Sequence, residues 1–383
     1  MADCNVCSAE LGEAIYRSAE ARSVTSMCEF YPGPTEVYFC GRCGHLQTTA
    51  IKNIETYYDS GYNILIDSEE EDTLYEIVEG KRVYRAEHQV QTLLRAIDLP
   101  EGARVLDFGC AKSATSRKLL EARSDLQVHL FDVSEAYIPF WERFVEPARW
   151  STYVPKPEWA ESFDVVLSFF ALEHVMAPRR FVADLAHLLK PGGYLHLLVP
   201  NVYANTADFV VADHVNHFSA ASLVTLLGSQ GFGRVSVDDQ AHEAAFVVSA
   251  LKSPAAPPTA VSNRVLADLR DRVTEMSRLW TGLSTRIRQF EQEQVGRRAA
   301  IYGSGFYGTF IASCLTDLTR VECFFDRNPF RQTKTLLGKS ILEPSRIDSE
   351  IDVVYVGLNP RIAHQAIEGL TEFRARPRQY FYM

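Results

Sequence analysis

The chain has 383 residues, of which 46% are hydrophobic and 23% charged, and its formal net charge is -10 at pH 7. This length exceeds what one hydrophobic core usually serves, so we expect two or three domains. An acidic chain is a poor counter-ion for phosphate backbones, which argues against nucleic acid as a partner. No apolar run reaches 18 residues and the start lacks a secretory pattern, so we expect a cytoplasmic protein without a membrane partner.

Cysteines gather at the start of the sequence, and two pairs have CxxC spacing. The paired residues are Cys4, Cys7, Cys40 and Cys43. Each pair lets two thiolates from one tight turn reach the same ion, so four thiolates predict a closed, structural zinc site. Metal-free thiols or a redox pair are the alternative. Cys28 and His45 are weaker candidates for a ligand.

Residues 88–252 alternate between strand-like and helix-like runs. The expected strands are 104–109, 128–133, 163–170 and 192–201, followed by a hairpin of 233–239 and 244–252. The expected helices are 88–97, 116–122, 177–190 and 219–230. This alternation predicts an α/β fold with a parallel sheet, in which ligands bind at the carboxyl ends of the strands.

The turn RVLDFGCAKSAT, residues 104–115, joins the first strand to a helix and contains a single glycine, Gly109. Asp107 ends this strand, and Asp132 ends the next, where a carboxylate can accept both hydroxyls of a ribose. The turn is either a cofactor loop of reduced glycine content or an ordinary strand-to-helix connection.

Histidines lie near the same predicted edge of the sheet. Asp213, His214 and His217 precede a helix whose N-cap is Ser219. Histidine suits proton transfer near neutral pH, although a structural turn would show the same residues. The dipeptide Glu173-His174 is a second candidate on this rim, with packing of the cofactor loop as its alternative.

The last third begins with a linker, residues 253–263, and a long amphipathic helix, residues 264–293. A strand, a glycine turn and a helix follow, which predicts a second, smaller Rossmann-like unit. Its Gly303, Gly305 and Gly308 have GxGxxG spacing, a weak nucleotide signal that a scaffold or substrate-covering domain would also show. The helix could pair with another chain, so the oligomeric state stays open.

The order LDFGC, FDVS, FDVVLSFFALEHV and LKPGGYLHLLVPN resembles the class I S-adenosylmethionine-dependent methyltransferases. The resemblance implies that Asp107 and Gly109 line the methionine end of S-adenosylmethionine and that Asp132 holds its ribose. The family's loop reads acid-x-Gly-x-Gly-x-Gly, and Ala111 and Ser113 stand here at the later glycine positions. The implied cofactor-binding residues are Asp107, Gly109, Ala111, Ser113, Asp132, Val133, Phe170, Glu173 and His174.

The stretch DRNPFRQTKTLLGKSILEP, residues 326–344, resembles the C-terminal domain of bacterial deoxysugar C-methyltransferases. Those proteins share the order of zinc module, methyltransferase domain and Rossmann-like domain. The resemblance implies a nucleotide-linked 4-keto sugar, deprotonated by His214, with Asp213 and His217 in place of the family's glutamate and tyrosine. Residues 54–63, the acidic run 67–72 and Ala241–Ala245 depart from the family on the substrate side.

We therefore predict a zinc module at 1–50, a methyltransferase domain at 51–252 with a substrate-side segment at 51–87, a linker at 253–263, and a helix plus Rossmann-like domain at 264–383. The predicted function is methyl transfer from S-adenosylmethionine to a small metabolite, most simply the carbon of a nucleotide-linked 4-keto deoxysugar. An O- or N-methyltransferase acting on a sugar, glycan or antibiotic precursor is one alternative. A non-catalytic, zinc-bearing scaffold is the other.

Overall fold

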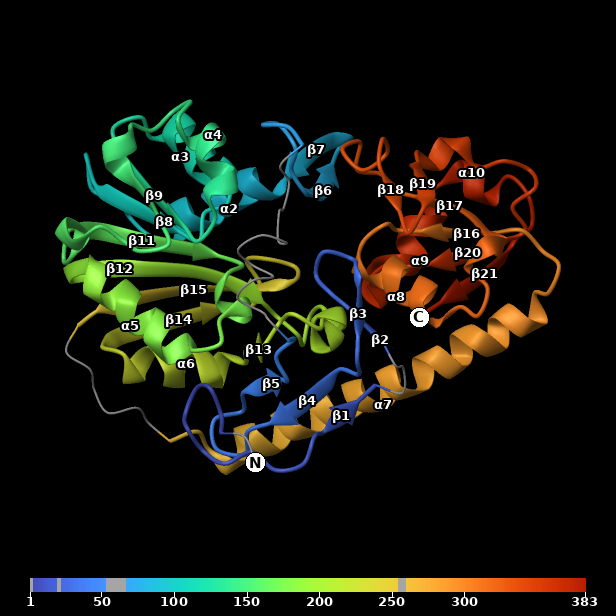
Figure 1. Ribbon diagram of the computed structural model, residues 1–383, viewed down its shortest axis with the longest axis horizontal. Helices are drawn as coiled ribbons and strands as arrows, with labels where there is room; N and C mark the ends of the chain where they lie inside the picture. The colour runs from blue at the N-terminus through green and yellow to red at the C-terminus, as the bar shows by residue number, and fades with distance from the viewer. Residues whose placement is uncertain (1–2, 19–21, 53–66, 254–259) are drawn as a thin grey trace. The chain divides into compact units, whose positions relative to one another are not determined.

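The computed structural model describes residues 3–18, 22–52, 67–253 and 260–383. Residues 54–63 and most of the predicted linker lie outside this described part. The chain forms two compact units, coloured by residue number in Figure 1. The first comprises Met1–Glu13, Tyr38–Asn205 and Asp213–Arg270, and the second comprises Ala14–Val37, Thr206–Ala212 and Asp271–Met383.

A seven-stranded sheet forms the centre of the first unit. Its spatial order is β10 (Trp150–Thr152), β9 (Gln127–Asp132), β8 (Arg104–Phe108), β11 (Phe163–Phe169), β12 (Leu189–Pro200), β15 (Ala245–Lys252) and β14 (Phe232–Asp238). The strands from β10 to β12 are parallel, whereas β15 runs antiparallel to both its neighbours, so the predicted hairpin closes the sheet. The strand order reverses between β8 and β11, the point at which such sheets bind ligands.

Helices cover both faces of this sheet (Figure 1). One face carries α2 (Arg85–Ala96), α3 (Ala114–Ala122) and α4 (Ile138–Trp141), and the other carries α5 (Pro178–Leu188) and α6 (Ala220–Ser229). Leu93, Leu119 and Trp141 are fully buried in the core under the first face. As predicted, Ser219 caps α6: its hydroxyl accepts a hydrogen bond from the amide of Ser222 at 3.1 Å.

Short strands bring the start of the chain to this domain. In the first unit, β5 (Leu46–Thr48) pairs antiparallel with β13 (Asn216–His217), and β6 (Leu74–Val78) forms a hairpin with β7 (Lys81–Tyr84) just before α2. The second unit contains the antiparallel pairs of β1 (Tyr16–Arg17) with the start of β4 (Glu36–Phe39), and of β2 (Arg22–Val24) with β3 (Phe30–Pro32). Residues 14–37 cluster with the C-terminal residues of this unit, where Arg22 donates to the carbonyl of Ser313 and Ser277 donates to the carbonyl of Ile15, both at 2.8 Å.

The second unit contains the predicted Rossmann-like sheet. Its order is β18 (Thr335–Leu336), β19 (Lys339–Leu342), β17 (Val321–Phe325), β16 (Ala299–Tyr302), β20 (Val353–Val356) and β21 (Gln379–Tyr382). The helices of this part of the chain are α7 (Asn263–Glu293), α8 (Phe306–Cys314), α9 (Pro360–Glu368) and α10 (Thr371–Arg374). A Cβ at Gly308 would lie 1.9 Å from the carbonyl oxygen of Gly303, so close packing of strand and helix by itself requires this glycine.

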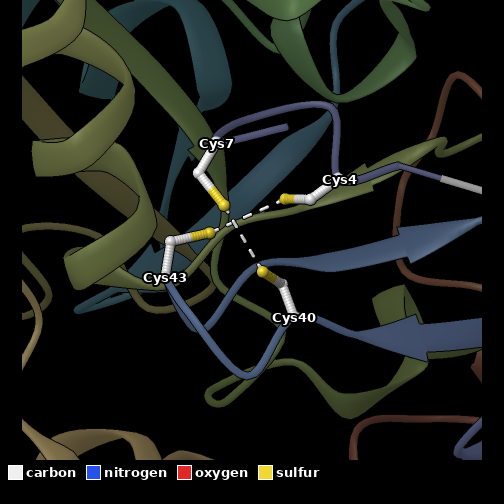
Figure 2. A group of neighbouring side chains, drawn as sticks. All are labelled: Cys4, Cys7, Cys40 and Cys43. Carbon is white, nitrogen blue, oxygen red and sulfur yellow. Dashed lines mark hydrogen bonds between the residues drawn. The ribbon is translucent and has the colours of Figure 1, made fainter. Parts of the chain in front are cut away.

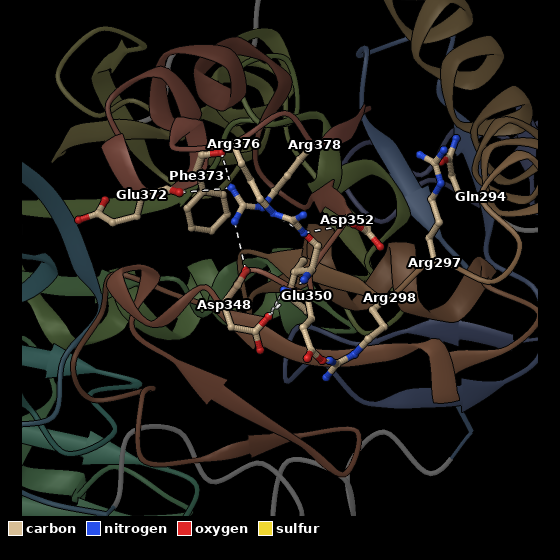
Figure 3. A network of polar contacts seen from close by, with 11 residues as sticks. Gln294, Arg297, Arg298, Asp348, Glu350, Asp352, Glu372, Phe373, Arg376 and Arg378 are labelled. Carbon is tan, nitrogen blue, oxygen red and sulfur yellow. Dashed lines mark hydrogen bonds and ion pairs between the residues drawn. The ribbon is translucent and has the colours of Figure 1, made fainter.

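Arginine side chains fasten the end of the second unit (Figure 3). Arg376 donates to the carbonyl of Ile351 at 2.6 Å, and Arg378 donates to the carbonyls of Ile351 at 3.0 Å and Phe373 at 2.8 Å. These bonds join the loop before β20 to the segment that leads into β21. No helix in the described part of the chain combines the length and apolar character needed to span a bilayer.

Candidate functional site

The loop after β8 keeps the backbone of a glycine-rich loop. Gly109, Ala111 and Ser113 have φ values of 77°, 46° and 59°, the left-handed conformation that glycine adopts most easily. These are the three alternate positions at which the family that the sequence resembles has glycine in this loop. A residue with a Cβ is strained there by about 1 kcal/mol. Hydrogen bonds hold Ala111 in place: its amide donates to Asp132 at 2.8 Å and its carbonyl accepts from the indole of Trp141 at 2.7 Å.

The two predicted acids lie where the loop meets the sheet. Asp107 is 2% exposed and accepts hydrogen bonds from the hydroxyls of Ser116 at 2.7 Å and Ser113 at 3.2 Å. Asp132 accepts from the amides of Ala111 and, at 3.1 Å, of Ser134. Burial raises the pKa of each carboxyl to about 6. Each oxygen of Asp132 keeps further acceptor capacity, which fits the paired hydroxyls of a ribose.

The acidic run 67–72 lies against this loop. The ammonium of Lys112 donates to the carbonyl oxygens of Ser68, at 2.9 Å, and Glu71. The carboxylate of Glu69 pairs with Arg117 on α3 and with Arg143. The run therefore fixes the loop after β8 and the helix α3 that follows it. Of the other predicted residues here, Val133 is 47% exposed at the end of β9.

Replacing Ala111 with glycine should stabilise the protein, because glycine relieves the left-handed strain while the amide still donates to Asp132. We expect the free energy of unfolding to rise by about 0.5–1 kcal/mol in urea titrations followed by tryptophan fluorescence. Ala183, in the middle of α5, is the matched control. Its replacement with glycine should lower the free energy by about 0.5–1 kcal/mol. Equal losses in both variants would contradict a strained loop.

The predicted histidines and acids come together beside the loop. The 3-10 turn η5 (Leu172–His174) follows β11, and a Cβ at Gly109 would lie 3.0 Å from the Cβ of Ala171, immediately before it. His174 lies between two buried carboxylates. Its Nδ1 is 3.8 Å from Asp213 Oδ2, and its Nε2 is 4.0 Å from Glu173 Oε1.

His214 stacks edge-on against His174, with ring centroids 4.6 Å apart and planes at 86°. Donor atoms of Glu173, His174 and His214 all lie within 4.8 Å of one another, so this set could also hold a metal ion. His217 is oriented differently: its Nε2 lies 2.7 Å from the hydroxyl of Thr48 on β5. The geometry thus suits a proton relay through His174 and His214, with His217 directed toward the N-terminal module.

A cluster of rings near Phe170 was not expected from the sequence. Tyr75 stacks on His88 with centroids 3.8 Å apart, and His242 meets both rings edge-on. Phe170 has a φ of 53°, and its ring centroid lies 5.9 Å from that of His242. Burial lowers the pKa of His242 to about 3 and lowers that of His88, so both rings are neutral at pH 7. Within the described residues, His242 Nε2 and His88 Nδ1 are buried without a hydrogen-bond partner.

The four predicted cysteines converge on one point (Figure 2). Their sulfur atoms lie within 4.8 Å of one another; Cys4 and Cys43 are 3.7 Å apart, and Cys7 and Cys40 are 3.5 Å apart. A tetrahedron with zinc–sulfur bonds of about 2.3 Å has edges of about 3.8 Å, so these distances suit a metal ion. They are far too long for disulfides. Cys28 and His45, the weaker candidates, do not belong to this group of neighbouring metal-binding side chains.

The four thiols also affect one another's protonation. Hydrogen bonds from Cys4 and Cys43 lower the pKa of Cys40, and the same bonds raise the pKa of Cys4 to about 12 and raise that of Cys43 further. One thiolate is therefore favoured while its neighbours are kept protonated. A bound dication reverses this preference, because it deprotonates the thiols that coordinate it.

Comparisons with known proteins concern the central segment. The family model described as "Methyltransferase domain" matches residues 79–237. Ubiquinone biosynthesis O-methyltransferase of Xanthomonas axonopodis pv. citri is 35% identical over 109 residues, which are 27% of this chain and 45% of that protein. The protein of the same name from Ruegeria pomeroyi is 34% identical over 98 residues, 24% of this chain and 39% of that protein. The chain thus spans less than half the length of either relative.

Among solved structures, an S-adenosylmethionine-dependent methyltransferase from Aquifex aeolicus is 20% identical with a TM-score of 0.35, covering 43% of this chain and 89% of that one. One from Mesorhizobium loti is 16% identical with a TM-score of 0.35, covering 43% and 97%. Residues 79–237 are thus similar to a methyltransferase domain, and the seven-stranded sheet has the predicted Rossmann-like α/β fold. The family match and the two relatives named as methyltransferases support an enzyme that transfers methyl groups.

Proposed function

We propose that the chain transfers the methyl group of S-adenosylmethionine to the carbon beside the carbonyl of a nucleotide-linked 4-keto deoxysugar. The cluster of Glu173, His174, Asp213 and His214 is the main support for this proposal. It lies next to the loop that carries Gly109, so a base and the cofactor would face the same space. Deprotonation of a carbon acid requires such a base, whereas many other acceptors do not.

The cofactor, when bound, supplies a methyl group on a positively charged sulfur. His214 would take the proton beside the acceptor carbonyl. The enolate would then attack the methyl carbon as its bond to sulfur breaks and both electrons of that bond go to sulfur. His174 would accept the proton from His214 and pass it to solvent, because Asp213 and Glu173 stabilise a positive charge on its ring. Asp107 and Asp132 would hold the cofactor in line for this displacement.

Two further assignments belong to this proposal. Zinc would occupy the four-cysteine site and act structurally, because four protein ligands leave no position for water. The cluster of Tyr75, His88 and His242 would line the acceptor. His242 Nδ1 accepts from the amide of Ala244 at 3.1 Å, so its buried Nε2 carries the proton and can donate to an acceptor oxygen.

O-methylation is the second candidate, and it is favoured by the similarity to the two ubiquinone biosynthesis O-methyltransferases. In that case the same histidines would deprotonate a hydroxyl group. N-methylation and a non-catalytic scaffold have less support. The absence of the later loop glycines would favour a scaffold, yet Ala111 and Ser113 keep the left-handed conformation of glycine at those positions.

Deuterium exchange separates these functions. The protein with S-adenosylhomocysteine is incubated in D2O with candidate acceptors, first thymidine diphosphate-linked 4-keto-6-deoxysugars and then phenols. A C-methyltransferase should exchange the proton beside the carbonyl and should methylate the same carbon when S-adenosylmethionine is added. His214→Asn should slow both steps at least about 100-fold, with cofactor affinity unchanged in calorimetry.

The exposed His187 on α5 provides the matched control, since His187→Asn should change neither step. Methylation of a phenol without carbon exchange would move the assignment to O-methylation. Full activity of His214→Asn would remove His214 from the reaction. A chelator that stops exchange without releasing zinc from the cysteines would instead assign the Glu173 cluster to a metal.

A further inference from the structure

Asn216 occupies the junction between the four-cysteine module and the candidate catalytic turn. It lies in β13, is fully buried, and pairs with Gln47 on β5 just after the second cysteine pair. No sequence pattern indicates a role for it, because it stands between His214 and His217, whose side chains suit proton transfer. Its side-chain amide makes hydrogen bonds to three separate segments of the first unit.

The nitrogen of this amide faces the turn η5. Asn216 Nδ2 donates to the carbonyl oxygens of Leu172 at 3.3 Å and Val175 at 2.7 Å. These two carbonyls bracket Glu173 and His174. The turn itself is short and is closed by backbone bonds from His174 to Ala171 and from Val175 to Leu172. Its position therefore depends on contacts from outside, and Asn216 provides two of them.

The oxygen of the same amide faces the cysteines. Asn216 Oδ1 accepts from Asn5 Nδ2 at 3.1 Å and lies 3.2 Å from His45 Nε2. Asn5 lies between Cys4 and Cys7, and His45 follows the second pair by two residues. Both N–H groups of the amide thus bind the turn η5. The amide oxygen binds Asn5, next to the first cysteine pair, and His45, next to the second. An asparagine side chain offers this capacity and no more.

A second connection runs parallel to the first. The amide of Thr48 donates to the carbonyl of Val215 at 2.9 Å, and the hydroxyl of Thr48 meets His217 Nε2 at 2.7 Å. Together these bonds attach residues 215–217, which directly follow His214, and the Glu173–His174 turn to segments that lie between or after the cysteines.

We propose that Asn216 is a positioning residue through which the fold of the four-cysteine module sets the location of Glu173 and His174. The catalytic role of Glu173 and His174 is the only part of this inference that rests on the proposed function. Metal binding at the cysteines would then support catalysis without contact with the acceptor. Loss of the metal should loosen the turn even though no cysteine lies in it.

Asn216→Asp tests this connection, because aspartate keeps an oxygen for Asn5 and His45 but loses the amide donors to Leu172 and Val175. We expect wild-type zinc content, altered imidazole nitrogen shifts of His174 and His214 in histidine-labelled protein, and about tenfold faster amide exchange at residues 174 and 175. His129 on β9 and His196 on β12 serve as internal references that should not move.

Two further arms separate positioning from general damage. Asn201→Asp places the same change at another buried asparagine, whose oxygen accepts from the amide of Tyr203, and should leave the shifts of His174 and His214 unchanged. Removal of zinc by a chelator should shift the same two histidines. The proposal is overturned if Asn216→Asp leaves the turn unchanged, or if Asn201→Asp alters it equally. Neither readout needs an acceptor or methyl transfer, so failure here is distinct from failure of the proposed function.

Discussion

Asp132→Ala is expected to weaken S-adenosylhomocysteine binding by about 100-fold in calorimetry. Asp132 ends β9 and is 8% exposed, with one oxygen bound to the amide of Ala111 and the other to that of Ser134. Its remaining acceptor capacity would take the two ribose hydroxyls. Hydrogen bonds to a charged group contribute about 1.5–3 kcal/mol each, and the loss of both outweighs partial replacement by water.

Asp164→Asn is the control for this variant. Asp164 stands at the start of β11, on the opposite edge of the sheet, where it pairs with Lys190 at 2.6 Å. We expect its affinity for S-adenosylhomocysteine to match that of the unchanged protein. Wild-type affinity of Asp132→Ala would show that the loop does not hold a ribose, and the left-handed positions would then need another explanation.

The same carboxyl makes cofactor affinity depend on pH. Burial raises the pKa of Asp132 to about 6, and hydroxyl groups donate best to the ionised form. Affinity should therefore fall below pH 6, by about tenfold per pH unit for one group. The stability of the cofactor-free protein should change in the opposite sense. Because the folded pKa exceeds the ordinary value of 3.8, stability should increase as pH falls from about 6 to about 4. Calorimetry and urea titrations over pH 4–8 test the two signs separately.

Local patterns in the sequence predicted the sheet and the positions of Asp107 and Asp132 on it. Asp107 and Asp132 could be placed because each ends an apolar run, and parallel strands bring such ends to one edge. The backbone of the loop could not be predicted in the same way. Alanine and serine at positions 111 and 113 give no signal of left-handed conformation, which arises here from hydrogen bonds to Asp132, Trp141 and Asp107.

Contacts between distant segments explain what the sequence did not predict. His88 and His242 are 154 positions apart and meet because α2 lies beside the connection between β14 and β15 that carries His242. The resemblance did point to Ala241–Ala245 as a departure on the substrate side, which was the one available signal for His242. Asn216 carries no catalytic chemistry, so only its contacts reveal it. Residues 14–37 join the second unit through contacts such as the hydrogen bond from Arg22 to the carbonyl of Ser313, which a cysteine count cannot indicate.

Cys43→Ser is expected to abolish metal binding at the N-terminal module. Its sulfur lies 3.7 Å from that of Cys4, and serine cannot replace a thiolate in a closed tetrahedral site. We expect elemental analysis to show one zinc ion per chain in the unchanged protein and none in the variant. The metal contributes about 10–16 kcal/mol in small zinc-dependent folds, far more than short strands such as β5 can supply.

Cys28→Ser is the matched control for Cys43→Ser, because Cys28 is a buried cysteine near the same end of the sequence but belongs to the second unit. It should keep one zinc ion per chain. β5 follows the second cysteine pair and pairs with β13. Cys43→Ser should therefore also increase amide exchange at residues 215–217, whereas Cys28→Ser should not. Zinc retained by Cys43→Ser, or lost from Cys28→Ser, would assign the ligands differently. Zinc lost without faster exchange in β13 would mean that the pairing with β5 holds without the metal.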